Sequence, residues 1–72
     1  MNHKLIDSFN LPKFDEQGYP ENRIVSVGDI VHDDLTDTNC KILVIAKDEW
    51  GNVGFQIESD YGNGLRHPWE LS

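Results

Sequence analysis

The chain is short of cysteine and of long apolar runs. Cys40 is the one cysteine among 72 residues, which excludes an intrachain disulfide. The three histidines, His3, His32 and His67, stand at no zinc-ligand spacing to it, so we expect no metal site. The longest apolar run, residues 42–46, is too short to cross a bilayer. A lone thiol, and no charged-then-apolar leader pattern, predict a cytoplasmic location.

Basic side chains are also scarce. Six Lys and Arg stand against thirteen Asp and Glu, for a formal net charge of -7. Nucleic-acid binders need a basic face that releases counterions from phosphates, and anionic membranes attract the same kind of face. We therefore expect no direct nucleic-acid partner and no membrane partner. An acidic surface complements a protein partner with a basic surface, although many small proteins are acidic for solubility alone.

Residues 1–23 are expected to form an N-terminal arm. They contain few strand signals, and Leu5 and Phe9 lie four apart, which gives one helical face over a turn or two before Pro12. A chain this short buries only about 60% of its unfolded surface, so it needs the arm's apolar groups in its core. We expect the arm to dock on the rest of the chain. The alternative is an arm that binds a partner. Residues 15–23 have the composition of a loop.

Residues 24–72 carry the signals of short strands. A strand from residue 24 is interrupted at Gly28, which marks a turn or bulge. Residues 40–47 form a β-branched run dense enough for a central strand with both faces covered. Residues 53–58 alternate, with three apolar side chains on one face: Val53, Phe55 and Ile57.

Turn-forming sequences separate these segments. Residues 33–39 are rich in Asp, Thr and Asn, residues 48–52 form a second turn, and residues 60–64 form a looser loop with two glycines. Pro68 favours a tight turn before Leu71 packs down. Four or five short strands without a long helix predict a mainly β fold, closed or nearly closed as a small barrel.

Three motifs, in this order and spacing, resemble the small SH3-like barrels. They are VGDIV at residues 27–31, the long hairpin at residues 41–58, and RHPWEL at residues 66–71. Bacterial and phage members of that group, with their KOW-type and Tudor-like relatives, show the same order. The resemblance implies an SH3-like barrel of four to five short antiparallel strands at residues 24–72, with the arm as an addition.

The resemblance does not extend to RNA binding. KOW-type modules usually carry a basic, glycine-rich turn before the second strand. Here the corresponding TDTNCK stretch has no glycine, and no Lys or Arg occurs from Ile24 to Cys40. The resemblance therefore implies the fold alone.

An aromatic set marks the expected contact surface. In SH3-like barrels, aromatic residues in the loops at one end line the ligand groove, because flat rings supply contact area with little loss of rotamer entropy. An acidic rim beside them favours a cationic guest. The alternatives are that Trp69 plugs the barrel end, which we favour, and that Trp50 folds onto its own hairpin. The candidate partner-binding residues are Trp50, Tyr61, Trp69, Asp48 and Glu49.

An acidic stretch supports a rival function. Four aspartates within nine residues, with no basic neighbour, resemble a ridge of phosphate charges: Asp29, Asp33, Asp34 and Asp37. Such a ridge suits a phage-type inhibitor that blocks a nucleic-acid-binding enzyme. The structural alternative, a solvated turn with aspartate caps, is the one we favour. A calcium loop is not predicted, because no glycine follows at the sharp bend.

Catalysis finds no support in the pattern. Cys40 and His32 are the one thiol–imidazole pair within a segment, and Cys40 begins a strand expected to be buried, where a thiol is inert. We expect no catalytic residue and no cofactor. The sequence predicts a small acidic, non-enzymatic protein-binding module. The phage-type inhibitor is the alternative, and an RNA- or ribosome-associated module is a weaker third possibility.

Overall fold

The protein is mainly β, as predicted. The computed structural model describes residues 3–14 and 16–72, so Met1, Asn2 and Asp15 of the predicted arm lie outside the described residues. No α-helix occurs in the part described. The elements in chain order are β1 (Lys4–Ile6), β2 (Ser8–Phe14), β3 (Pro20–Ser26), β4 (Ile30–Asp33), β5 (Thr38–Lys47), β6 (Val53–Ser59), β7 (Gly62–Arg66) and the 3-10 helix η1 (Pro68–Glu70).

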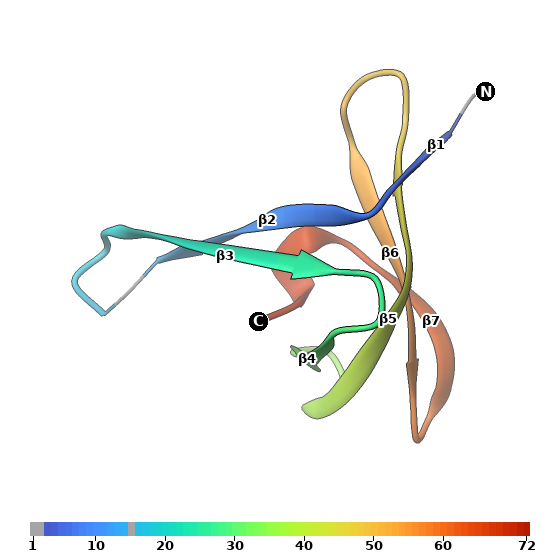
Figure 1. Ribbon diagram of the computed structural model, residues 1–72. Helices are drawn as coiled ribbons and strands as arrows, with labels where there is room; N and C mark the ends of the chain where they lie inside the picture. Colours follow the sequence, from blue (N-terminus) through green and yellow to red (C-terminus); the bar gives the residue numbers. More distant parts are fainter. Residues whose placement is uncertain (1–2, 15) are drawn as a thin grey trace.

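The strands form two antiparallel sheets (Figure 1). In the larger sheet β5 is central, as its β-branched run predicts. β6 pairs along one edge of β5, and β4 and β1 share the other edge, opposite residues 38–41 and 45–47 respectively. β7 pairs with β6. The smaller sheet is the β2–β3 hairpin, which extends away from the larger sheet.

The core follows the alternation of β6. Phe55 and Ile57 are fully buried, as expected, and Val53 packs against them. On β5 the buried Ile42 and Ile45 are three residues apart, although alternate residues of a strand share a face. The pairing with β6 shifts between residues 42 and 44, and the extra residue moves the side chains after it to the opposite face. The remaining core side chains come from β2, β3, β4, the start of β5 and the segment after η1: Leu11, Val25, Val31, Cys40 and Leu71.

The prediction of a helical face in the arm is wrong. Residues 4–6 and 8–14 are strands, because β1 finds its hydrogen-bonding partner in β5 and β2 finds its partner in β3. β3 starts at residue 20, so four of the nine residues of the expected loop at 15–23 are strand, while residues 16–19 connect β2 to β3, and the expected boundary after residue 23 falls inside β3. Leu11 is buried in the core, and the Phe9 ring meets Phe55 edge-on at 5.8 Å.

The end of the chain returns to β4. Leu71 is buried, as predicted, and forms a bridge with Asp33. The backbones of His32 and Ser72 exchange two hydrogen bonds, both 2.9 Å long. These bonds hold the segment after η1 against β4. Neither sheet closes into a barrel, because β7 pairs with β6 alone among the strands that the structure describes.

Candidate functional site

The turn between β5 and β6 is organised by the Asp48 carboxylate. Its Oδ1 accepts the backbone N–H groups of Trp50 and Asn52, both at 2.9 Å, and Oδ2 accepts the Asn52 side chain at 3.3 Å. Gly51 follows with a φ of 86°, a left-handed conformation that glycine adopts without strain. The fixed backbone leaves the Trp50 side chain outside, with 68% of its surface exposed. The alternative that Trp50 folds onto its hairpin is therefore not what the structure shows.

The same hydrogen bonds stabilise the ionised form of Asp48. Burial acts to raise the pKa of this carboxyl, but the backbone N–H groups of Asn52 and Trp50 and the Asn52 side chain together hold the pKa below its ordinary value of 3.8. Asp48 is consequently a fixed negative charge beside Trp50 at neutral pH.

Trp69 lies on the outside of η1, so the prediction that it plugs the end of the core is wrong. In a 3-10 helix, residues three apart share a face. Pro68 and Leu71 are buried on the inner face, which turns Trp69 outward with 70% of its surface exposed. The imidazole of His67 stacks on the indole, with ring centroids 4.5 Å apart and an interplanar angle of 9°. Glu70 Oε1 accepts the His67 N–H at 2.7 Å and holds the start of η1.

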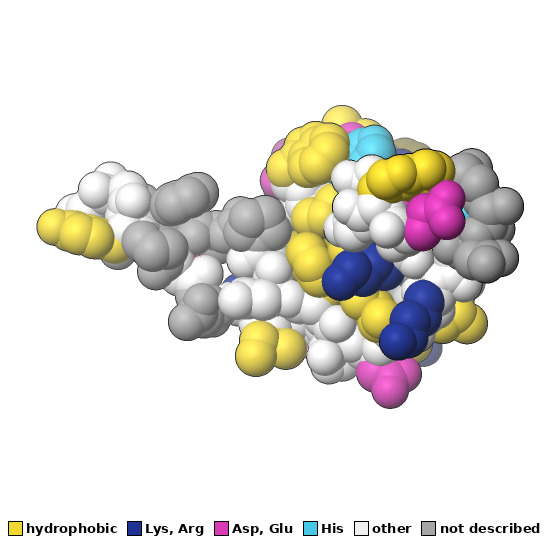
Figure 2. Space-filling view, turned by 90° about the horizontal axis from the view of Figure 1, so that it is seen from above, with side chains coloured by type: hydrophobic (Ala, Val, Ile, Leu, Met, Phe, Trp, Pro, Cys, Tyr) yellow, Lys and Arg dark blue, Asp and Glu magenta, His cyan; other side chains and the backbone are white. Residues whose placement is uncertain are grey.

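A groove joins η1 to the β5–β6 turn. It has a volume of about 540 Å³, and its floor is made by Phe9 and Val53. One wall comes from the turn and the other from η1. Figure 2 looks down on this end of the molecule and shows hydrophobic side chains beside histidine and acidic side chains. We call this end of the molecule the turn-end surface and define it by five residues: Asp48, Glu49, Trp50, His67 and Trp69.

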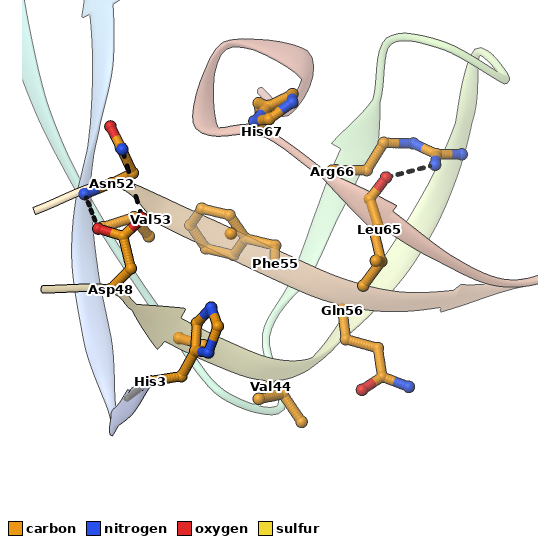
Figure 3. A pocket seen from close by; sticks show the side chains of 12 residues that line it. His3, Val44, Asp48, Asn52, Val53, Phe55, Gln56, Leu65, Arg66 and His67 are labelled. Carbon is orange, nitrogen blue, oxygen red and sulfur yellow. Dashed lines mark hydrogen bonds between the residues drawn. The ribbon is translucent and has the colours of Figure 1, made fainter. Parts of the chain in front are cut away.

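A second groove, of about 500 Å³, runs from the turn-end surface across the sheet towards β7 (Figure 3). Asp48, Asn52 and His67 line both grooves. Farther along, the second groove is lined by Val44, Gln56 and Leu65, one from each of β5, β6 and β7. The turn-end surface is therefore continuous with the exposed face of the sheet.

Tyr61 is not part of this site. It lies in the β6–β7 turn with 74% of its surface exposed, while Trp50 lies in the turn at the other end of β6 (Figure 1). At about 3.3 Å per residue, β6 separates the two turns by roughly 20 Å. The expected loop at residues 60–64 is also shorter than predicted, since β7 begins at Gly62. The structure thus places Trp50 and Tyr61 on opposite ends, and Trp69 accompanies Trp50 instead.

Asp33 is buried and does not belong to a surface ridge. Its side chain accepts two parallel hydrogen bonds from Arg66, at 2.9 and 3.0 Å, one from the Thr36 hydroxyl at 2.8 Å, and one from the Leu35 N–H at 3.2 Å. The bonds from Arg66 are the largest influence and, despite burial, hold the pKa of Asp33 below its ordinary value. This ion pair ties β4 to β7 through the interior. It is structural.

The other acidic candidates are dispersed. Asp34 and Asp37 lie 3.8 and 3.0 Å from His32 Nε2. Asp29 is exposed, and its Oδ2 accepts the Ser26 N–H at 2.8 Å, which closes the preceding turn. The four aspartates therefore do not present one continuous row of unpaired charges.

Sequence reasoning missed Arg66 and His67. No local pattern reveals that Arg66 meets an aspartate 33 positions away. For His67 a signal existed, since it stands two residues before a tryptophan across a proline that favours a tight turn. Cys40 is buried, as predicted, and burial raises the pKa of its thiol. Residues 3–14 and 16–72 contain no group of three or more His, Cys, Asp or Glu arranged to hold a metal ion.

No helix in the described part of the chain has the length and apolarity needed to span a bilayer. Comparisons with protein-family models, with curated proteins and with solved structures found no match to this chain.

Proposed function

We propose that this chain is a small protein-binding module that contacts its partner through the turn-end surface. The observation that carries the proposal is a pair of indoles, each more than two-thirds exposed: Trp69 lines the groove, and Trp50 lies in the turn whose other residues line its opposite side. Single exposed apolar residues are ordinary in soluble proteins. Two exposed tryptophans beside an open groove are not, because together they leave a large apolar area in water.

The chemistry of this end favours a protein partner with a basic surface. Tryptophan is the residue type most enriched among the residues that dominate binding energy at protein interfaces. The ionised Asp48 carboxylate lies beside the indoles, so cationic side chains of a partner meet both a negative charge and aromatic faces. The net charge of -7 adds a long-range attraction for such a partner.

We further propose an SH3-like arrangement for residues 24–72. Its support is the order of the elements. A short strand follows the Gly28 turn, a long hairpin forms the middle, and the segment at Leu71 returns to that first strand through the bridge with Asp33. This is the order on which the resemblance of the sequence depends.

The rival function, imitation of nucleic-acid charge, has weaker support. A mimic needs a row of carboxylates in water, yet Asp33 is buried against Arg66, and Asp34 and Asp37 lie beside His32. The rival also predicts binding that falls steeply with salt, whereas an aromatic contact tolerates moderate salt.

The test is affinity capture with matched variants. The immobilised chain, its Trp50→Ala and Trp69→Ala variants, and a Tyr61→Ala control are exposed to lysate of the source cells, and quantitative mass spectrometry compares what each retains. Tyr61 is the matched control because it is equally exposed but lies at the other end of β6. The protein whose retention differs between variants is then purified, and its Kd is measured by calorimetry.

We expect each tryptophan variant to weaken binding by about 2 kcal/mol, or roughly 30-fold in Kd. The Tyr61→Ala control should bind as the wild type does, and moderate salt should change the Kd little. Binding that survives both tryptophan substitutions refutes the proposal. Binding that competes with added nucleic acid and vanishes in salt supports the rival.

A further inference from the structure

β7 is the last strand of the larger sheet and has one neighbour. Its five residues pair with β6 in regular register, from Phe55–Arg66 to Ser59–Gly62. After β7 the chain turns into η1 and returns to β4 instead of covering the free edge of β7. Among the described strands, none lies along that edge. Apart from the Leu65 carbonyl, which accepts a hydrogen bond from the Arg66 side chain, its outward backbone groups are therefore available to an added strand.

The edge of β7 lacks three of the usual protections against strand addition. Natural edge strands are blocked by lysine, by proline or by a bulge. β7 reads Gly62-Asn63-Gly64-Leu65-Arg66, with no lysine or proline and no register shift. Its one charged side chain, that of Arg66, donates to the buried Asp33 and also, through Nη1, to the Leu65 carbonyl at 2.9 Å, so one backbone acceptor of β7 is already occupied.

A row with two apolar side chains and one glutamine leads across the sheet to this edge. The register places Val44, Gln56 and Leu65 opposite one another on β5, β6 and β7, so their side chains share one face. All three line the groove of about 500 Å³, and Figure 3 shows Gln56 and Leu65 side by side. Leu65 is 78% exposed. A residue paired with Leu65 on an added strand would extend this row and cover its side chain.

The neighbouring row sets the charge of the occupant. Glu58 and Asn63 pair two positions along from Gln56 and Leu65, hence on the same face. Glu58 and Asp60, in the adjoining turn, are both exposed. An added strand would therefore meet Leu65 and, two residues along, Asn63, with Glu58 one strand farther away on β6, where it is paired with Lys41. A second copy of this chain is the less suitable occupant, because two chains of charge -7 repel each other.

We propose that β7 receives an extended segment of a partner protein by strand addition, with an apolar side chain packed on Leu65 and a Lys or Arg two residues away, opposite Asn63 and on the same face as Glu58. Main-chain hydrogen bonds along the edge would supply affinity, and the alternating side chains would supply selectivity. This site rests on the sheet edge and does not depend on the role of the tryptophans.

The test uses a defined pool of synthetic peptides of about six residues, the usual length of a strand. Each position is Val, Ile, Leu, Phe, Gly, Lys or Arg, and every peptide has an apolar residue and a basic residue two positions apart. Two control pools keep the apolar positions. One replaces Lys and Arg by Asp and Glu, and the other has every backbone amide N-methylated and so cannot donate hydrogen bonds. Amide hydrogen exchange of the full chain is followed residue by residue by NMR with each pool.

We expect the basic pool to slow exchange of the outward amides of β7 by about tenfold or more, since pairing protects them from solvent. Leu65→Lys should abolish this protection, and Glu58→Gln should weaken it several-fold. Leu35→Lys is the matched control, because Leu35 is also exposed, at 62%, but lies in the β4–β5 turn. It should respond as the wild type does, and so should Trp50→Ala, which alters the turn-end surface alone.

Four results would overturn the proposal. They are no protection of β7 with millimolar basic pool, an equal response to the acidic pool, an equal response to the N-methylated pool, and β7 amides already protected without peptide in a dimer of this chain. A failure here with a positive capture experiment removes the edge site and leaves the turn-end surface in place.

Discussion

Replacing Asp33 by Asn tests whether the buried ion pair holds the larger sheet together. The side chain is fully buried and accepts four hydrogen bonds, two of them from Arg66. Asparagine keeps the shape but has one acceptor oxygen, so about half of these bonds are lost and the guanidinium, itself only 16% exposed, keeps an uncompensated charge. Breaking one partner of a buried pair costs about 3–5 kcal/mol.

We expect Asp33→Asn to lower the free energy of unfolding by about 3 kcal/mol, the lower end of that range, because the amide retains some bonds. For a domain of this size the midpoint of thermal unfolding then falls by roughly 12–24 °C. Urea unfolding followed by far-UV circular dichroism measures the difference. Tryptophan fluorescence is unsuitable, because both indoles are already exposed in the folded state.

Asp37→Asn is the matched control. The Asp37 side chain is 93% exposed, and its φ of 55° suits asparagine as well as aspartate. The control should stay within about 0.5 kcal/mol of the wild type. A loss of less than about 1 kcal/mol for Asp33→Asn would refute the reasoning, since the pair would then be no stronger than an exposed one.

The effect of Asp33→Asn should depend on pH with a definite sign. The pKa of Asp33 is lowered in the folded state, so the stability it adds is complete above the ordinary value of 3.8 and is lost as the pH falls through and below that value. The difference between wild type and variant should therefore be constant at neutral pH and shrink in acid. A difference that grows in acid contradicts this assignment.

Three further outcomes follow from the geometry. Gly28 has a φ of 95° and open space around it, so Gly28→Ala should lower the free energy of unfolding by about 1 kcal/mol or more through backbone strain. Gly54→Ala, with equal space and no positive φ, should lower it less. Urea unfolding compares the two variants, and equal losses would contradict the strain. Cys40 is 2% exposed, and burial raises the pKa of its thiol. A thiol reagent should therefore label Cys40 slowly in buffer and rapidly in denaturant. Fast labelling of the folded protein would contradict its burial. Acrylamide should quench the fluorescence of Trp50 and of Trp69 nearly as well in the folded as in the unfolded chain, because both indoles are exposed. Each tryptophan is measured in the variant that lacks the other. An indole protected from acrylamide would contradict the turn-end surface.

Local patterns accounted for the strands whose partners are close in the chain. The alternation of residues 53–58 predicts the buried Phe55 and Ile57, and the β-branched run before it predicts a central strand. These predictions succeeded because the hairpin pairs neighbours, and burial of one face of a strand leaves a period of two in the sequence. The arm was misjudged for the opposite reason. β1 pairs with β5, about forty positions on, and no local period records so distant a partner.

The sequence by itself therefore determined the mainly β class, the approximate positions of most turns, the negative charge and the place of Trp50 in a turn. Only the tertiary structure decided which of those residues meet. It put Trp69 beside the turn of Trp50, sent Tyr61 to the far end of β6, and buried Asp33 against Arg66. The physical reason is that propensity and periodicity act within a few residues, whereas a contact surface and a buried ion pair depend on how distant strands register against one another.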